Sequence, residues 1–388
     1  MSAPDPRDFL DVDHLLSDEE RQIRDLVREW TTDNVIPGIE GWFETGTFPK
    51  EFALRLGELG LLGMHLEGYG CLGANAVSYG LACMELEAGD SGFRSFVSVQ
   101  GSLCMFPIRT YGSDQQRERY LPKMATGEII GCFGLTEPDF GSDPTHMRTA
   151  AKPDGDGWVL SGTKMWITNG GIADLAIVWA QTDDGVRGFL VPTDTPGFST
   201  NDIHRKLSLR ASVTSELVLD GVHLPQDAVL PGVVGMKGPL SCLTEARYGI
   251  VWGAMGAARS CFECALGYAK TRVQWGRPIA GFQLTQEKLA NMATELNKGT
   301  LLALHLGRMK DEGRLRPEHV SMGKLNNVRE ALEIARTART ILGASGITLE
   351  YPVIRHANNL ESVLTYEGTS EIHTLILGQA LSGERAFD

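Results

Sequence analysis

The stretch GWVLSGTKMWITNG, residues 157–170, is rich in β-forming residues and lies in the middle of a chain that otherwise reads as helix. Three similar runs follow it: LAIVWAQT (175–182), GFLVPTD (188–194) and SELVLDGVHLP (215–225). Strands favour β-branched and aromatic residues, and Gly, Asp, Asn and Pro separate these runs. The sequence therefore predicts a small β-sheet or barrel domain at residues 129–235.

Helical patterns flank this β-rich region on both sides. Ser17 and Glu20 have the spacing of a capping box, and Ile23, Val27 and Trp30 follow with helical periodicity. After the β-rich region the chain returns to long helical stretches that contain Ala and Gly and can pack closely. We predict an α+β fold with an N-terminal helical domain (1–128), the middle β domain and a C-terminal four-helix bundle (236–388). A β insert between helical parts offers a crevice suited to a flat cofactor.

Composition excludes several classes of function. Of 388 residues, 42% are hydrophobic and 22% charged, as in an ordinary soluble protein, and the net charge of −13 argues against a nucleic-acid partner. No run approaches the ~20 apolar residues that cross a bilayer, and the N-terminus lacks a signal peptide, so we expect a cytoplasmic protein without stable membrane insertion. Seven scattered cysteines suggest reduced thiols. The CFEC pair, Cys261 and Cys264, lies in a helical pattern that favours core packing over a metal centre, and we expect no metal.

The stretch LTYEGTSEIH, residues 364–373, contains a local break in a helical region. Gly368 costs roughly 1 kcal/mol inside a helix relative to Ala, so the break needs a reason. One reason is structural: a loop ends at Gly368, and Thr369 or Ser370 caps the next helix with Glu371 nearby. The other is that the break presents Glu367 to a substrate.

Five motifs occur in an order that resembles the acyl-CoA dehydrogenase family: GCFGLTEPDFGSD (131–143), GTKMWITNG (162–170), TRVQWGRPI (271–279), ILGASGI (341–347) and TYEGTSEIH (365–373). The resemblance covers nearly the whole chain, and several independent motifs make it specific. It implies an FAD-dependent enzyme that desaturates an acyl-CoA thioester and passes electrons to an electron-transferring flavoprotein. It also implies a homotetramer whose FAD sites are completed across subunit contacts.

The resemblance assigns residues to the cofactor. Those expected to border the flavin are Phe133, Leu135, Thr136, Trp166, Ile167 and Thr168. Around the phosphates and the adenosine half we expect Ser142, Arg272, Gln283, Gly343, Gly346, Thr369 and Glu371, with Ser142 near either the cofactor or the CoA phosphates. The two glycines would let a second subunit approach closely. The alternatives are a turn and core residues for the first group, a surface charge for Arg272 and helix endings for the glycines.

By the same resemblance, Glu367 is the base that removes the proton next to the thioester carbonyl. Burial beside the flavin would raise the pKa of its carboxyl toward the working pH, because desolvation disfavours the anion. A side chain at position 368 would obstruct the approach of backbone and substrate. In the family the backbone N–H of the base, here that of Glu367, also donates to the thioester oxygen.

Within the family, the likeness extends to the glutaryl-CoA dehydrogenases through ELEAGDSGFRSFVSVQGSL (85–103) and EARYGIVWGAMGA (245–257). It implies that Arg94, with Ser95 and Thr168, binds the distal carboxylate of glutaryl-CoA, and that CO₂ leaves to give crotonyl-CoA. The other residues expected at the substrate are Glu87, Ser142, Arg247 and Tyr366. Glu87 precedes Arg94 by about two turns of a helix, so a purely structural ion pair is the alternative.

Three other functions stay open from the sequence. The stretches TNGG (168–171) and HLEGYG (65–70) depart from the glutaryl-CoA dehydrogenase pattern, which leaves room for a short- or medium-chain acyl-CoA dehydrogenase that does not decarboxylate. An acyl-CoA oxidase would share the same fold and base. A flavin-free helical assembly protein is the alternative from another class.

Overall fold

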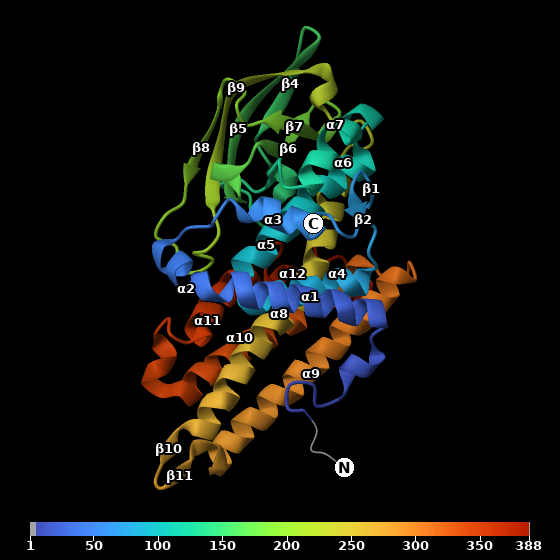
Figure 1. Cartoon of the computed structure of the whole chain (residues 1–388). Helices are drawn as coiled ribbons and strands as arrows, with labels where there is room; N and C mark the ends of the chain where they lie inside the picture. The colour runs from blue at the N-terminus through green and yellow to red at the C-terminus, as the bar shows by residue number, and fades with distance from the viewer. Residues whose placement is uncertain (1–4, 388) are drawn as a thin grey trace.

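The first part of the chain is helical, as predicted (Figure 1). The computed structural model describes residues 5–387. Both halves of the predicted capping box form, because the Glu20 N–H donates to Ser17 Oγ and the Ser17 N–H donates to the Glu20 carboxylate. The elements of this part are η1 (Val12–Leu15), α1 (Asp18–Asn34), α2 (Ile36–Thr45), α3 (Phe52–Glu58), β1 (Glu67–Gly68), β2 (Cys71–Leu72), α4 (Ala76–Gly89), α5 (Ser91–Ser98), the π-helical η2 (Val99–Met105), α6 (Phe106–Tyr111) and α7 (Asp114–Ala125).

The chain breaks its helix at Asp90, between α4 and α5. Asp90 is extended, with φ −165° and ψ 144°, and its carboxylate accepts a hydrogen bond from the Gly92 N–H at 2.7 Å. The same carboxylate accepts bonds from Arg355 Nη1 at 2.5 Å and Asn359 Nδ2 at 2.8 Å. The expectation that one helix runs from Glu87 to Arg94 was therefore wrong, because a buried capping carboxylate tied to α11 ends α4 and starts α5.

The β-rich middle forms one seven-stranded sheet whose strand order is β3-β6-β4-β5-β9-β8, with β7 paired to β6. β3 pairs with β6 in parallel, and β5 pairs with β9 in antiparallel fashion. The ladder of β5 and β9 is irregular between Lys164 and Ile167, so Met165 and Trp166 form a bulge. The elements are β3 (Gly131–Gly134), η3 (Pro144–His146), β4 (Ala150–Asp154), β5 (Gly157–Thr168), η4 (Gly170–Ile172), β6 (Leu175–Thr182), β7 (Gly185–Pro192), β8 (Phe198–Asp202), β9 (Thr214–Pro225) and η5 (Gln226–Ala228).

A buried ion pair fixes the end of β3 against β5. Lys164 Nζ donates to Glu137 Oε1 at 2.8 Å and to the Leu135 carbonyl at 3.0 Å. The Glu137 carboxylate also accepts from the backbone N–H groups of Arg148 and Thr149. Burial lowers the pKa of Lys164 to about 8, although the Glu137 carboxylate opposes the shift. The loop after β3 and the bulge in β5 are therefore held by one ammonium group.

Long helices form the last part of the chain. Their elements are α8 (Lys237–Thr271), β10 (Val273–Gln274), β11 (Arg277–Pro278), η6 (Ile279–Gly281), α9 (Gln283–Asp311), α10 (Pro317–Leu342), η7 (Gly343–Ile347), α11 (Pro352–Thr365) and α12 (Ser370–Ser382). α8 crosses α4 closely, because a Cβ at Gly256 would lie 1.9 Å from the Met84 carbonyl oxygen. The predicted class, helical, then β, then helical, is confirmed.

The state of the cysteines and the lengths of the apolar helices can be compared with the expectations from the sequence. The seven cysteines are free thiols in the structure, and Cys261 and Cys264 lie on α8, the former buried in the helical core. Within residues 5–387, no helix is both long and apolar enough to traverse a bilayer.

The crossing of α4 and α8 predicts a sharp difference between two glycines on the same helix. Gly256→Ala should lower the free energy of unfolding by about 1–3 kcal/mol or more, because its methyl group would overlap a backbone carbonyl that cannot move away cheaply. Gly267→Ala meets nothing within 4 Å and should be neutral or stabilising by about 0.5–1 kcal/mol. Urea unfolding of both variants measures the difference, and equal stabilities would contradict the close crossing.

The buried ion pair leads to a second prediction. Lys164→Met should lower the free energy of unfolding by about 3–5 kcal/mol, because the Glu137 carboxylate stays buried without its cation. Lys152→Met, at an exposed position on β4, is the matched control and should change stability by less than about 0.5 kcal/mol. Denaturant titration of both proteins decides, and a loss below about 1 kcal/mol at Lys164 would refute the role of the pair.

Candidate active site

The turn between α11 and α12 carries Glu367 in a backbone conformation that few residues adopt. Glu367 has φ 54° and Gly368 has φ 98°, so two successive residues are left-handed. A Cβ at Gly368 would lie 3.0 Å from His373 Nε2 and 3.2 Å from Arg247 Nη2. Glycine is therefore required here by the positive φ and by neighbouring side chains of the protein, in addition to any ligand.

The structural explanation of the helix break in LTYEGTSEIH, a cap for the next helix, is observed. Thr369 is the N-cap of α12, and its hydroxyl accepts a hydrogen bond from the Ile372 N–H at 3.3 Å. Glu371 lies exposed in the first turn of the same helix. Capping explains where α12 begins, and the unusual turn before it sets the direction of Glu367.

Glu367 is half-buried, and the Oε2 atom of its carboxyl is buried and poorly satisfied. Among the described residues, none offers a hydrogen-bond partner to its Oε2 atom. Burial raises the pKa of this carboxyl above its ordinary value of 4.5, and the positive charges of Arg94, Lys324 and Arg247 oppose the shift. A carboxylate that is desolvated and has a free oxygen is a stronger base than one in water.

Arg94 and its partners form a polar cluster beside Glu367. Arg94 Nε donates to Glu87 Oε2 at 2.6 Å, and Arg94 Nη2 donates to the Tyr366 hydroxyl. Ser91 Oγ donates to Glu87 Oε1 at 2.8 Å. Arg94 Nη1 and Ser95 Oγ are buried, and within residues 5–387 neither has a hydrogen-bond partner. These two unsatisfied groups, one of them cationic, belong to successive residues of α5 and are of the kind that binds the oxygens of a carboxylate.

Gly253 on α8 leaves space for the carboxylate and the guanidinium of this cluster. A Cβ at Gly253 would lie 2.0 Å from Glu87 Oε2 and 3.2 Å from Arg94 Nε. The predicted substrate residues Glu87, Arg94, Ser95 and Tyr366 are thus brought together, although by a different backbone path from the single helix expected. Arg247 joins them, because its Nε donates to the Glu367 carbonyl at 2.6 Å.

The residues expected at the flavin divide into two groups. Trp166 is 61% exposed on the bulge of β5, with φ 64°, and the Met165 N–H donates to the Thr136 carbonyl at 2.9 Å. The bulge is thus hydrogen-bonded to the Thr136 backbone and carries the exposed indole of Trp166. Backbone groups can bond the edge of a flat aromatic group, and an indole can pack against its face. Phe133 and Leu135 are instead buried in the core between the sheet and the N-terminal helices.

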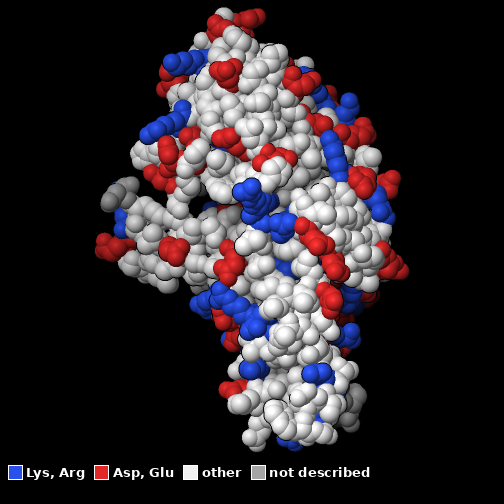
Figure 2. Space-filling model, turned by 90° about the vertical axis from the view of Figure 1, so that its left-hand side faces the viewer, with Lys and Arg blue, Asp and Glu red and all other residues white. Residues whose placement is uncertain are grey.

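The remaining residues near this bulge differ in exposure. Ile167 is buried within the sheet, Thr168 is half-buried opposite Thr214 of β9, and Ser142 lies exposed in the loop after β3. Figure 2 shows the surface notched between the β-rich part at the top and the helices below it, with Lys and Arg side chains near the notch.

The residues expected at the FAD diphosphate and adenosine lie at the far end of the long helices. Helix α8 begins against the sheet, since a Cβ at Gly238 would lie 2.5 Å from the Trp179 ring. The 35 residues of α8 extend about 50 Å from there to the exposed Arg272. Tyr268 near that end contacts Tyr351 with ring centroids 5.9 Å apart, which places the loop after α10 there too. One chain therefore does not bring Arg272, Gln283, Gly343 and Gly346 to Trp166. Gly343 is also the C-cap of α10, as the helix-ending alternative predicted.

Sequence reasoning missed two residues at the site, Lys324 and His373. Lys324 is buried on α10 and donates to the Gly368 carbonyl at 2.7 Å and to the Tyr366 carbonyl. His373 is buried on α12 beside Gly368. The available signal for Lys324 was its helical spacing from the apolar Val320 and Val328, which places a lysine on the core face of α10.

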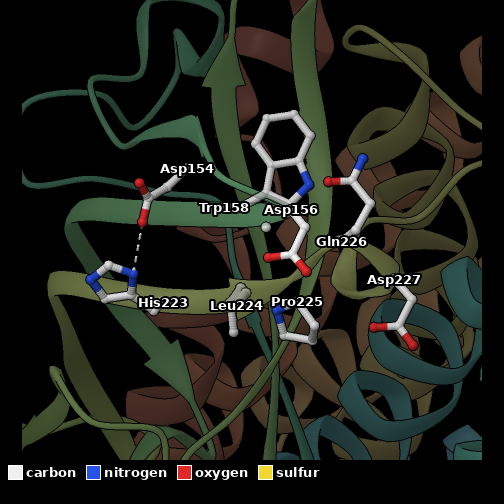
Figure 3. A pocket seen from close by; sticks show the side chains of 9 residues that line it. Asp154, Asp156, Trp158, His223, Leu224, Pro225, Gln226 and Asp227 are labelled. Carbon is white, nitrogen blue, oxygen red and sulfur yellow. Dashed lines mark ion pairs between the residues drawn. The ribbon is translucent and has the colours of Figure 1, made fainter.

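Two surface hollows lie away from Glu367. One, of about 530 Å³, is at the end of the sheet, where Asp154 and His223 form an ion pair of 3.3 Å and Trp158 lines the wall (Figure 3). Another, of about 620 Å³, lies between residues 5–16 and the helices beneath them. Neither contains a residue predicted for the cofactor or the substrate.

Comparisons with known proteins match the whole architecture. The N-terminal, middle and C-terminal domain models of the acyl-CoA dehydrogenase family match residues 17–128, 132–222 and 234–382. A crystal structure of a glutaryl-CoA dehydrogenase from Mycobacterium smegmatis in complex with FADH2 is 65% identical, with a TM-score of 0.98, and the match covers 99% of this chain and 100% of that one.

Two curated relatives are similar over most of their length. The mitochondrial short-chain specific acyl-CoA dehydrogenase of Bos taurus is 34% identical over 380 residues, which are 96% of this chain and 92% of that protein. The glutaryl-CoA dehydrogenase of Desulfococcus multivorans is 35% identical over 387 residues, which are 96% of this chain and 99% of that protein. The chain therefore belongs to the acyl-CoA dehydrogenase family of oxidoreductases.

Proposed function

We propose that this protein oxidises glutaryl-CoA and decarboxylates it to crotonyl-CoA and CO₂. The observation that carries the proposal is the pair of buried, unpartnered groups, Arg94 Nη1 and Ser95 Oγ, next to the turn that holds Glu367. An acyl chain without a distal carboxylate would leave both unsatisfied. The similarity to glutaryl-CoA dehydrogenases of Mycobacterium smegmatis and Desulfococcus multivorans supports the same substrate.

Glu367 and the Arg94 pocket divide the chemistry. Arg94 and Ser95 bind the distal carboxylate and so fix the acyl chain, and Glu367 removes the proton next to the thioester carbonyl. Bound FAD supplies the acceptor for the hydride of the neighbouring carbon. The distal carboxylate then leaves as CO₂, the electrons of the broken C–C bond pass into the thioester, and Glu367 returns its proton to the terminal carbon.

FAD is the cofactor that the exposed residues of the site fit. Trp166, Thr136 and Thr168 of one chain would border its flavin, with Ser142, Thr369 and Glu371 nearer its phosphates and ribose. Arg272, Gln283, Gly343 and Gly346 of a second copy would hold the diphosphate and adenosine, since these residues lie about 50 Å along α8 from the sheet. We accordingly propose a homotetramer that passes electrons to an electron-transferring flavoprotein.

A short-chain acyl-CoA dehydrogenase without decarboxylation is the second candidate. It is favoured by the ion pair of Arg94 with Glu87, which neutralises the guanidinium without a substrate, and by the hydrogen bond of Arg94 to the Tyr366 hydroxyl. The likeness to the short-chain enzyme of Bos taurus agrees with it. The two candidates differ only in whether the free Nη1 group of Arg94 binds a ligand.

Turnover of two substrates separates the candidates. In the wild type, glutaryl-CoA should give crotonyl-CoA, identified by mass. Arg94→Met should lower kcat/KM for glutaryl-CoA by about 10²–10³-fold, or about 3–4 kcal/mol, while that for butyryl-CoA changes less than about 10-fold.

The double variant Glu87→Gln/Arg94→Met controls for the carboxylate that the single variant leaves buried, and it should show the same selectivity. Arg28→Met, whose partner Glu85 keeps Arg259, is the control for loss of an arginine elsewhere. A wild type that prefers butyryl-CoA, with no effect of Arg94→Met on the preference, would exclude the dicarboxylate substrate.

The raised pKa of Glu367 predicts the acid side of the pH profile. Only the carboxylate can act as a base, so kcat/KM should fall as pH decreases through a pKa above 4.5. Arg94 is among the charges that lower this pKa, so Arg94→Met should move the acid limb to higher pH with butyryl-CoA as substrate. A limb that stays in place in the variant, or one centred at or below 4.5, would mean that the carboxyl is not tuned in this way.

A further inference from the structure

Three successive carbonyl groups of the Glu367 turn each accept a hydrogen bond from a buried cation. Lys324 Nζ donates to the carbonyl of Gly368 at 2.7 Å and to that of Tyr366. Arg247 Nε donates to the carbonyl between them, that of Glu367, at 2.6 Å. Lys324 is 2% exposed and Arg247 8%, so both charges act in a medium that screens them weakly.

The hydrogen bonds to the Tyr366 and Glu367 carbonyls polarise two peptide groups of the turn. The Tyr366 carbonyl and the Glu367 N–H belong to one peptide group, and the Glu367 carbonyl and the Gly368 N–H belong to the next. In the part of the chain that the structure describes, neither N–H has a protein acceptor. A cation on the carbonyl oxygen polarises the peptide and makes its N–H a stronger donor.

We infer that Lys324 is a positioning residue that holds and polarises the peptide between Tyr366 and Glu367, so that the Glu367 N–H donates more strongly to the thioester oxygen as negative charge develops there. The inference rests on the proposed dehydrogenation, because that step creates the enolate charge. Lys324 acts through the backbone and does not touch the reacting atoms. Its effect should therefore be larger on enolate-like ligands than on neutral ones.

The groups around Lys324 come from every element packed against it. They are Glu367 and Tyr366 in the turn, with Lys324 Nζ 5.6 Å from the tyrosine ring centroid, and Arg247 on α8, Arg94 on α5 and His373 on α12. Burial lowers the pKa of Lys324 to about 7; Glu367 opposes the shift, and Arg247 and Arg94 add to it. Burial, with the charges of Lys324 and Arg247, lowers the pKa of His373 to about 3, so this ring stays neutral.

The direction of the pH effect follows from these groups. Well below pH 7 the ammonium of Lys324 polarises the turn fully, and the effect weakens as pH rises through about 7, because the neutral amine is a weaker donor. The Glu367 carboxyl acts in the opposite sense, since it gains activity as pH rises. We therefore expect kcat of the wild type to decline above about pH 7 and this decline to disappear when Lys324 is replaced. The acid limb should remain and move to higher pH, because Lys324 is among the charges that lower the pKa of Glu367.

Ligand binding to the full-length holoenzyme tests the inference with two thioesters. 3-Oxobutanoyl-CoA has an acidic carbon between two carbonyls and can bind as an enolate, whereas crotonyl-CoA stays neutral. In Lys324→Met, calorimetry should show a loss of affinity of about 10–100-fold for 3-oxobutanoyl-CoA and less than about 3-fold for crotonyl-CoA. kcat should fall by a similar factor with KM nearly unchanged.

Two further variants complete the experiment. Lys324→Gln keeps a neutral donor at the turn and should recover part of the lost affinity, and it replaces Lys324→Met if that protein does not fold. Lys310→Met, which removes a cation paired with Glu245 away from the turn, should change neither affinity. Equal losses for both ligands, or none for 3-oxobutanoyl-CoA, would overturn the role of Lys324. Failure of glutaryl-CoA turnover alone would instead count against the proposed substrate.

Discussion

The constraint on which the site depends is the burial of three cations around one short turn. Arg94, Arg247 and Lys324 are all nearly inaccessible to solvent, and a buried cation without partners costs several kcal/mol. Two carboxylates, Glu87 and Glu367, and the carbonyls of the turn supply the compensation. Near neutral pH the charge of Lys324 is partial, because burial lowers its pKa to about 7.

Small residues allow the charges to meet. Gly253 leaves space for the Glu87 carboxylate, and Gly256 lets α8 approach the backbone of α4, which carries Glu87. Asp90 then turns the chain so that Arg94 points back toward Glu87 from a second helix. Arg355 and Asn359 of α11 hold the Asp90 carboxylate, and α11 leads directly into the turn at Glu367. Helix α11 therefore positions both the Asp90 turn before Arg94 and the turn that holds Glu367.

Local patterns in the sequence predicted much of this fold but little of its long-range chemistry. Capping at Ser17 and the β-rich runs depend on neighbouring residues, so they could be read directly from the sequence. The break at Asp90 depends on Arg355, 265 positions away, and a local pattern of apolar residues still favoured a helix there. Lys324 was missed for a similar reason: its partners are backbone carbonyls, which no sequence motif reveals. The family resemblance identified Glu367 and Arg94 as candidate site residues. It did not predict where the side chain of either residue lies.

In a buried polar site, the cost of leaving a hydrogen-bond donor without an acceptor affects the choice of ligand more than the attraction between the groups does. A buried donor without an acceptor costs about 1–3 kcal/mol, and more when the group is charged. Arg94 Nη1 and Ser95 Oγ both carry this cost in the absence of a ligand, because Glu87 and Tyr366 occupy only the other two nitrogens of the guanidinium. A distal carboxylate removes the cost at both atoms, whereas a terminal methyl group would bury them beside apolar surface. A pocket built to hydrogen-bond its substrate rejects analogues that lack the group by a larger factor than a hydrophobic pocket rejects an extra methylene. The ion pair with Glu87 holds the guanidinium of Arg94 in place and leaves its Nη1 atom without a partner among the described residues.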